Sequence, residues 1–164
     1  MDLADQEVKR IFKLPGIHMR GRGGIDYEWS PDLKWIAYTT RTGNNSYNIW
    51  VIPADGGEAK NVTRLSAFHS QPTWSPDGQS VAYAADVDRN FDIYVLDLAS
   101  GVERRITRDP YLDLRPRWSS DGSQILFTTA RSGTFDLWAY NLELETASPV
   151  VTSNQANTAG DWIG

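Results

Sequence analysis

The chain holds few residues whose types and spacing suit catalysis. His69 and Ser70 are its only adjacent histidine and serine. Adjacent residues rarely point at one another productively, and no Gly-x-Ser-x-Gly sequence supplies a strained nucleophile turn. We therefore expect no catalytic residue, and we interpret His69 as a loop histidine that packs beside Phe68.

The segment from Asp86 to Asn90 places oxygen-bearing side chains at alternate positions, and Asp97 follows Asp86 by eleven residues. This spacing superficially resembles a calcium-binding loop. However, Phe91 replaces the glycine of such loops, and Arg89 neutralises part of the negative charge. The sequence therefore favours a solvated turn. With no cysteine and two histidines, we expect no metal site elsewhere in the chain.

Acid/base chemistry of the glycosidase type would need two carboxylates that converge across a cleft. The residues that could line a common axis carry mixed side chains: Asp26, Glu28, Gln71, Thr73, Arg115, Arg117 and Asp161. This mixture suits a polar, water-filled channel better than an acid/base pair. The segment 21–24 is too short to form a phosphate-binding loop, and no Gly-Lys-Ser/Thr follows it, so we expect no cofactor.

Composition limits the partners of the chain. Its 164 residues carry a net charge of −5, which argues against nucleic-acid binding because such proteins need a basic surface. No apolar run approaches the ~18 residues of a membrane span. Aromatic residues make up 12% of the chain, and this content favours strands over helices.

A repeat positions these residues. Trp29, Trp74, Trp118 and Trp162 are spaced by 45, 44 and 44 residues. Similar phrases open at the first three: Trp29-Ser30-Pro31-Asp32, Trp74-Ser75-Pro76-Asp77-Gly78 and Trp118-Ser119-Ser120-Asp121-Gly122. A short polar residue also recurs before a later apolar segment, as Asn48, Asp92 and Asp136. Recurrence in every unit favours a structural role, in which these side chains and those of Asp32, Asp77 and Asp121 bond backbone amides.

Each unit reads as four short strands. In the second unit we predict strands at about 71–75, 80–85, 91–98 and 103–107, separated by turns rich in Pro, Asp and Gly. The second and third strands are apolar on both faces, so each sheet must be covered on both sides. Four-stranded units of about 44 residues achieve this by packing around an axis, and the sequence therefore predicts an all-β fold, a β-propeller segment of four-stranded antiparallel blades.

The whole chain, 1–164, is predicted to be one propeller segment. The repeats cover approximately 25–69, 70–113 and 114–157, and partial blades are expected at 7–20 and 158–164. Three blades cannot close a ring, and exposing roughly 500 Å² of apolar surface on each outer face would cost on the order of 12 kcal/mol. We therefore expect a homo-oligomer, such as a dimer that closes a six-bladed ring, or a segment of a longer propeller chain. In an alternative arrangement, the partial blades combine into a fourth blade of a monomer. A purely structural or designed segment would have the same ends.

The phrase Trp-Ser-Pro-Asp-Gly, a following Ile/Val-Ala-Tyr strand and the later Asp-Ile-Tyr-Val resemble the repeat of TolB-type propellers. Similar repeats occur in tricorn-protease propellers and in the N-terminal propellers of related peptidases. The resemblance covers about Ile25 to Trp162, although Ser120 stands where proline is usual. It implies either a periplasmic, TolB-like binding protein or a cytoplasmic, tricorn-like propeller that guides peptides to a separate serine peptidase domain.

We predict that the chain itself is not an enzyme and that it binds a protein or peptide. In such blades the longer, varied loops emerge on one face, and loops on a rigid scaffold commonly carry function. Aromatic residues and arginine are enriched at binding hot spots. The predicted ligand-binding residues of this loop face are Arg22, Arg41, Phe68, His69, Arg89, Tyr111, Arg115 and Arg131.

Overall fold

A computed structural model describes residues 26–42 and 46–151, which form strands and turns with no helix. The twelve strands are β1 (Tyr27–Trp29), β2 (Trp35–Thr42), β3 (Ser46–Pro53), β4 (Lys60–Asn61), β5 (Phe68–Trp74), β6 (Ser80–Asp86), β7 (Phe91–Asp97), β8 (Glu103–Arg105), β9 (Asp113–Trp118), β10 (Gln124–Thr129), β11 (Asp136–Asn141) and β12 (Thr146–Val151). They confirm the predicted all-β fold. The described part of the chain contains no helix with the length and apolar character needed to cross a membrane.

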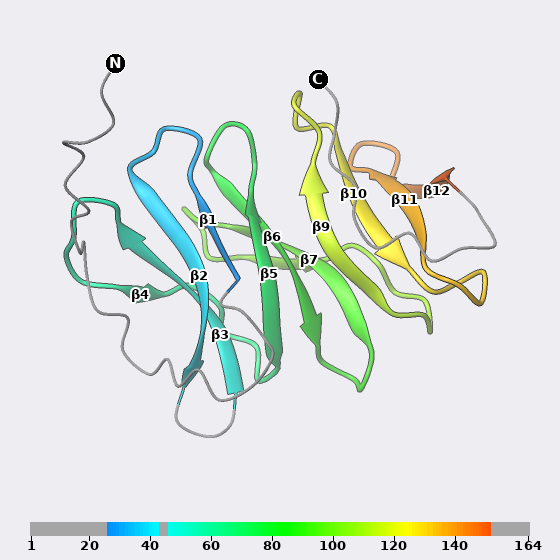
Figure 1. The fold of residues 1–164 in the computed structure, drawn as a ribbon, viewed down its shortest axis with the longest axis horizontal. Coiled ribbons are helices and arrows are strands. Elements are labelled where there is room, and N and C mark those ends of the chain that lie inside the picture. Colours follow the sequence, from blue (N-terminus) through cyan, green and yellow to red (C-terminus); the bar gives the residue numbers. More distant parts are fainter. Residues whose placement is uncertain (1–25, 43–45, 152–164) are drawn as a thin grey trace, which may run out of the picture.

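The strands form three antiparallel meanders of four, which we call blades I (β1–β4), II (β5–β8) and III (β9–β12). Blade III is a separate sheet, whereas blades I and II are connected by one parallel pair, Tyr47 with Phe68. The blades lie side by side in chain order, with the turns between their first and second strands at the top of Figure 1. The β6–β7 and β10–β11 loops lie at the opposite end, which we call the loop face.

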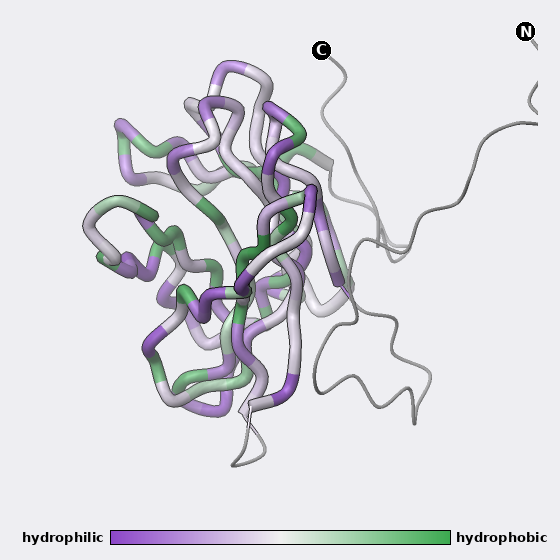
Figure 2. Tube along the Cα trace, turned by 90° about the vertical axis from the view of Figure 1, so that its left-hand side faces the viewer, coloured by the Kyte–Doolittle hydropathy of each residue, from purple (hydrophilic) through white to green (hydrophobic). Residues whose placement is uncertain are grey.

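The side chains of each blade alternate between its two neighbours. Along β6, Val81 and Tyr83 pack in the core cluster shared with blade I, whereas Ala82 and Ala84 pack in the cluster shared with blade III. Because successive side chains of a strand point to opposite faces, β6 contributes to both clusters. In Figure 2, hydrophilic residues mark several of the turns at the blade ends, away from these clusters.

The repeated tryptophans of blades II and III form hydrogen bonds to the preceding blade. The indole N–H of Trp74 donates to the carbonyl of Glu28 in blade I, with 3.2 Å between the heavy atoms. The indole of Trp118 makes the same bond to the carbonyl of Thr73 in blade II, also at 3.2 Å. The repeated tryptophan therefore marks the joint between blades, which explains its constant spacing.

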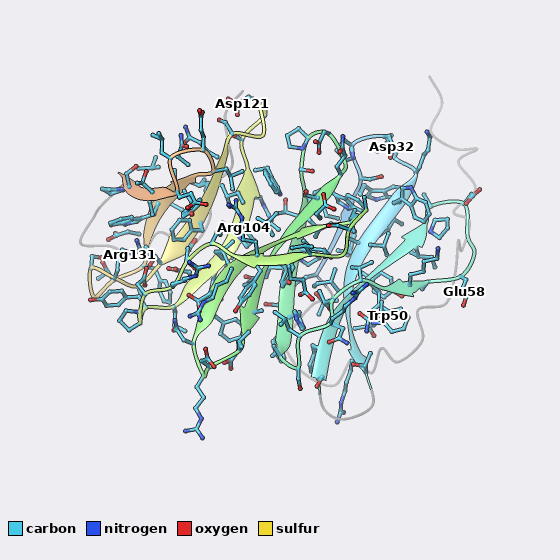
Figure 3. All side chains as sticks on the ribbon, turned by 180° about the vertical axis from the view of Figure 1, so that it is seen from behind. Asp32, Trp50, Glu58, Arg104, Asp121 and Arg131 are labelled. Atoms are coloured by element: carbon cyan, nitrogen blue, oxygen red, sulfur yellow. The ribbon has the colours of Figure 1, made fainter. Side chains whose placement is uncertain are left out.

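The turn aspartates have the structural role that their recurrence indicates. In blade II, the Ser75 hydroxyl donates to Asp77 Oδ1 over 2.6 Å, and the same oxygen accepts the backbone N–H of Gln79 over 2.9 Å. Asp32 and Asp121 repeat this geometry in blades I and III. Figure 3 shows both of these aspartates at the same end of the blades. Turn geometry therefore accounts for all three carboxylates.

A third apolar cluster, with Ile36, Tyr38 and Ile52, lies on the face of blade I that points away from blade II. At the rim of this face, Tyr27 and Trp29 are exposed by 65% and 41%. The predicted partial blades at 7–20 and 158–164 lie outside the described residues. In blade II, the equivalent face, with Val81 and Tyr83, packs against blade I. This face of blade I therefore has the orientation of one that packs against a preceding blade.

Candidate functional site

Aromatic rings from two blades meet on the loop face. Phe68, at the start of β5, lies 4.6 Å from the ring centroid of Tyr47 on β3 and 5.9 Å from that of Phe91 on β7. Each ring stands where a strand begins, so the backbone of the sheets fixes its position. Phe68 remains 41% exposed, which leaves an aromatic surface open to a partner.

Asn90 ties neighbouring loops of this face together. Its side-chain amide donates to the carbonyls of Asp109 and Tyr111, both over 3.0 Å. The backbone N–H of Tyr111 in turn donates to Asp109 Oδ1 over 3.1 Å. These bonds hold the connection between blades II and III against the β6–β7 loop. The ring of Tyr111 is 43% exposed and thus adds a second aromatic residue to the surface.

Arg105 on β8 holds the β6–β7 loop through ion pairs. Its guanidinium forms ion pairs with Asp92, at 2.6 Å, and with Asp88, at 3.4 Å. Burial raises the pKa of the Asp92 carboxyl, although the nearby Arg105 charge partly offsets that rise. We expected Asp92 to bond a backbone amide. Instead, its carboxylate accepts from the Thr107 hydroxyl, and it is that hydroxyl that accepts the N–H of Ile93.

A second arginine holds the following loop. Arg131 Nη2 lies 2.6 Å from Asp109 and 3.3 Å from Asp113. Its guanidinium also lies over the ring of Trp138, with Cζ 4.1 Å from the centroid. Burial raises the pKa of the Asp113 carboxyl to about 6, and the Thr129 hydroxyl opposes that rise. Because the side chain of Arg131 is only 13% exposed, it fixes the loops and presents little surface to a ligand.

His69 lies inside the molecule and not on the loop surface. Its side chain is fully buried on β5, where Nδ1 is 2.8 Å from the carbonyl oxygen of Tyr47 and the ring is 5.4 Å from that of Tyr83. Burial lowers the pKa of the imidazole. Ser70, the next residue on the same strand, is also buried. The structure thus places His69 in the joint between blades I and II.

The remaining predicted residues separate into two groups. Phe68, Arg89 and Tyr111 are exposed on connected parts of the loop face, and Arg41 is exposed at the end of β2. Arg115 is exposed on β9, where its backbone N–H donates to the Gln71 side chain over 2.8 Å, so it belongs to the joint between blades II and III. Arg22 lies outside the described residues.

Sequence reasoning missed three exposed neighbours of this surface: Val87, Arg108 and Leu112. Val87 adjoins Asp88, Arg108 adjoins Asp109, and Leu112 adjoins Tyr111. Their position in a loop was the only feature of the sequence that could have indicated their exposure. Asp113 was also missed. Its position five residues before Trp118, equivalent to that of His69 before Trp74, would have indicated a buried site.

The exposed side chains of this surface include aromatic, aliphatic and cationic groups. Among residues 26–42 and 46–151, no group of three or more His, Cys, Asp or Glu side chains is placed to hold a metal ion. Asp88 is paired with Arg105, and Asn90 donates to backbone carbonyls. Asp88 and Asn90 of the calcium-like segment are thus engaged within the fold.

Comparison with known proteins places these features in a wider group. A family model described as the TolB beta propeller domain matches residues 24–164. The Tol-Pal system protein TolB of Anaeromyxobacter dehalogenans is 38% identical over 65 residues, which cover 40% of this chain and 14% of that protein. An uncharacterized peptidase of Bacillus subtilis, YuxL, is 32% identical over 75 residues, which cover 46% of this chain and 11% of that protein.

Solved structures show the same likeness in three dimensions. The crystal structure of TolB from Acinetobacter baumannii superposes with a TM-score of 0.76 and 26% identity. The match covers 83% of this chain and 34% of that one. The chain therefore spans a small part of the length of these relatives.

Proposed function

Since the chain belongs to the TolB beta propeller domain family, we propose that it is a non-catalytic scaffold whose loop face binds a protein or peptide. The observation that carries this proposal is the exposed surface of Phe68, Arg89 and Tyr111. Phe68 begins strand β5, and the other two residues stand in loops that ion pairs and hydrogen bonds hold in place. A preorganised surface loses little conformational entropy on binding.

Binding of fluorescently labelled peptides from a randomised library tests this function. Phe68→Ala and Tyr111→Ala are expected to weaken binding of the selected peptides, because aromatic residues dominate binding surfaces. Leu144→Ala is the matched control, since Leu144 is equally apolar and 68% exposed but lies in the β11–β12 turn, away from the loop face. Selected peptides that bind both loop-face variants as tightly as the unchanged chain would contradict the proposal.

The similarity to YuxL supports a second candidate function, in which the propeller guides peptides to a peptidase domain. In that role the loop face would select substrates, and the chemistry would take place outside this chain. Loop-face variants in a parent that carries a peptidase domain would then change the cleavage of long peptides more than that of short ones. Equal effects on both lengths would exclude guiding by this face.

The outer faces of blades I and III have no neighbouring blade among the described residues. We propose that further blades supply the cover, either from a longer propeller chain or from a second copy that closes a six-bladed ring. The exposed Trp29 supports this, because its counterparts Trp74 and Trp118 both donate to a preceding blade. Light scattering on the 164-residue chain tests the second copy. A monomer with no dimer at any concentration would exclude it.

A further inference from the structure

We infer that Arg89 is the anion-recognising residue of the loop face, and that the partner is a peptide segment in which a carboxylate follows an apolar side chain. This inference rests on the proposed binding function and names the chemistry of its ligand. It depends on the backbone of Arg89, on the absence of an internal partner for its guanidinium, and on the apolar surface beside it.

Arg89 has a backbone conformation that normally selects glycine. Its φ is 62°, in the left-handed region, and the equivalent residue of blade III, fifteen positions after its tryptophan, is Gly133 with a φ of 89°. A side chain in this region is disfavoured because its Cβ approaches the following carbonyl oxygen. Such strain persists mainly where the surrounding structure imposes it, and it is frequent at functional sites.

The residues on either side of Arg89 are fixed while its own side chain is not. Asp88 forms an ion pair with Arg105, and Asn90 donates to two carbonyls of the next loop. Within the described ranges, Arg89 is exposed and makes no hydrogen bond or ion pair, and the same holds for Arg108 in the neighbouring loop. The guanidinium groups of Arg89 and Arg108 are thus exposed to solvent, beside a β6–β7 loop that the bonds of Asp88 and Asn90 hold in place.

Arg105 pairs with Asp88 and Asp92, and Arg131 pairs with Asp109 and Asp113, so these four carboxylates are engaged by arginines other than Arg89 and Arg108. Asp86 is the nearby carboxylate for which the described residues provide no partner, and it is half-buried. Among the described residues of these loops, Arg89 and Arg108 are therefore the cations without an internal partner, and a ligand carboxylate would supply one.

Apolar contact area lies next to these cations. Val87 is 38% exposed two residues before Arg89, and Phe68 is 41% exposed on β5, opposite Asp86 in the sheet. Tyr111, 43% exposed, follows Arg108 by three residues, and its carbonyl accepts from Asn90. An apolar side chain can thus contact the rings while a neighbouring carboxylate accepts two parallel N–H bonds from a guanidinium.

An array of hexapeptides tests the inference, with Leu or Phe followed by Glu, Gln or Lys at otherwise identical positions. We expect binding in the order Glu, Gln, Lys. Arg89→Gly should lower affinity for the Glu peptides about tenfold, the loss expected for one charge-assisted pair. The same variant should raise the thermal midpoint, because glycine relieves the strained φ. A loss of binding by a more stable protein cannot result from misfolding.

Arg104→Ala is the matched control, because Arg104 is an exposed arginine on β8 that pairs with Glu145 away from the loops. It should leave the affinity for the Glu peptides unchanged, whereas Asp86→Asn should tighten their binding. Equal binding of Glu and Gln peptides, or unchanged binding by Arg89→Gly, would overturn the inference while leaving the binding function standing. Failure of every peptide to bind would overturn both.

Discussion

His69 and Asp113 occupy the same position in successive blades, five residues before Trp74 and Trp118, and both side chains are fully buried. Burial penalises the charged form of each, so it lowers the pKa of the histidine and raises that of the aspartate. Two equivalent positions therefore give the stability of the fold opposite dependences on pH.

The Asp113 carboxyl favours the folded state when it is neutral. Its pKa rises from an ordinary 3.8 to about 6 on folding, so its contribution is complete at low pH and is lost as the pH increases through about 6. The rise corresponds to about 3 kcal/mol. In Asp113→Asn, which stays neutral, this loss should vanish. Urea unfolding between pH 4 and 8 measures it, and an unchanged pH profile would contradict the assignment.

The His69 imidazole acts in the other direction. Because its pKa is lower in the folded state than the ordinary 6.5, stability should be lost as the pH falls below 6.5. Replacing it by asparagine, which can still donate to the Tyr47 carbonyl, should remove this loss and leave the Asp113 effect alone. The variant should then become less stable as the pH rises from 5 to 7. A profile that still loses stability toward acid would indicate another group.

Leu33 has a backbone φ of 60°, whereas the equivalent residues Gly78 and Gly122 have 70° and 73°. The leucine is 66% exposed, so it gains little from packing. Leu33→Gly should stabilise the fold by about 1 kcal/mol, because glycine adopts this region freely. Leu33→Ala, which keeps a Cβ, is the control and should give no such gain in urea unfolding. An equal gain in both variants would assign the effect to the lost side chain.

Tyr38 and Tyr83 are equivalent buried tyrosines with different partners. The Tyr83 hydroxyl donates to Glu103, whereas the described residues provide no partner for the Tyr38 hydroxyl. Ala59 stands in blade I where Glu103 stands in blade II, and it packs against the Tyr38 cluster. Ala59→Glu should give Tyr38 an acceptor and stabilise the fold by about 1 kcal/mol.

Ala59→Leu is the control for this exchange, because it adds volume without an acceptor. Thermal unfolding compares the two variants with the unchanged chain. If Ala59→Leu stabilises the fold as much as Ala59→Glu, packing and not the hydroxyl bond would be responsible. Tyr38→Phe should abolish the gain from Ala59→Glu.

The sequence alone indicated the blades and their joints. The tryptophans recur every 44 or 45 residues, and a Ser-x-Asp phrase follows each of the first three. These residues specify local turns and strand pairs that form from residues close in the chain. The predicted strands at 80–85 and 91–98 match β6 and β7 to within a residue or so at each end. Strand β8 is shorter than predicted because its ladder with β7 ends at Arg105.

Tertiary structure decided which of the predicted binding residues are exposed and which are held by internal contacts. Arg131 and Arg89 both stand in loops between second and third strands, and nothing local distinguishes them. Arg131 is held by Asp109 and Asp113, some twenty residues earlier in the chain, and by the ring of Trp138. The part of the chain that the structure describes provides no such partners for Arg89. The exposure of an arginine side chain depends on whether carboxylates of an adjacent blade lie beside it. The packing of the blades brings these residues together, and the repeat in the sequence does not indicate which arginines will be paired.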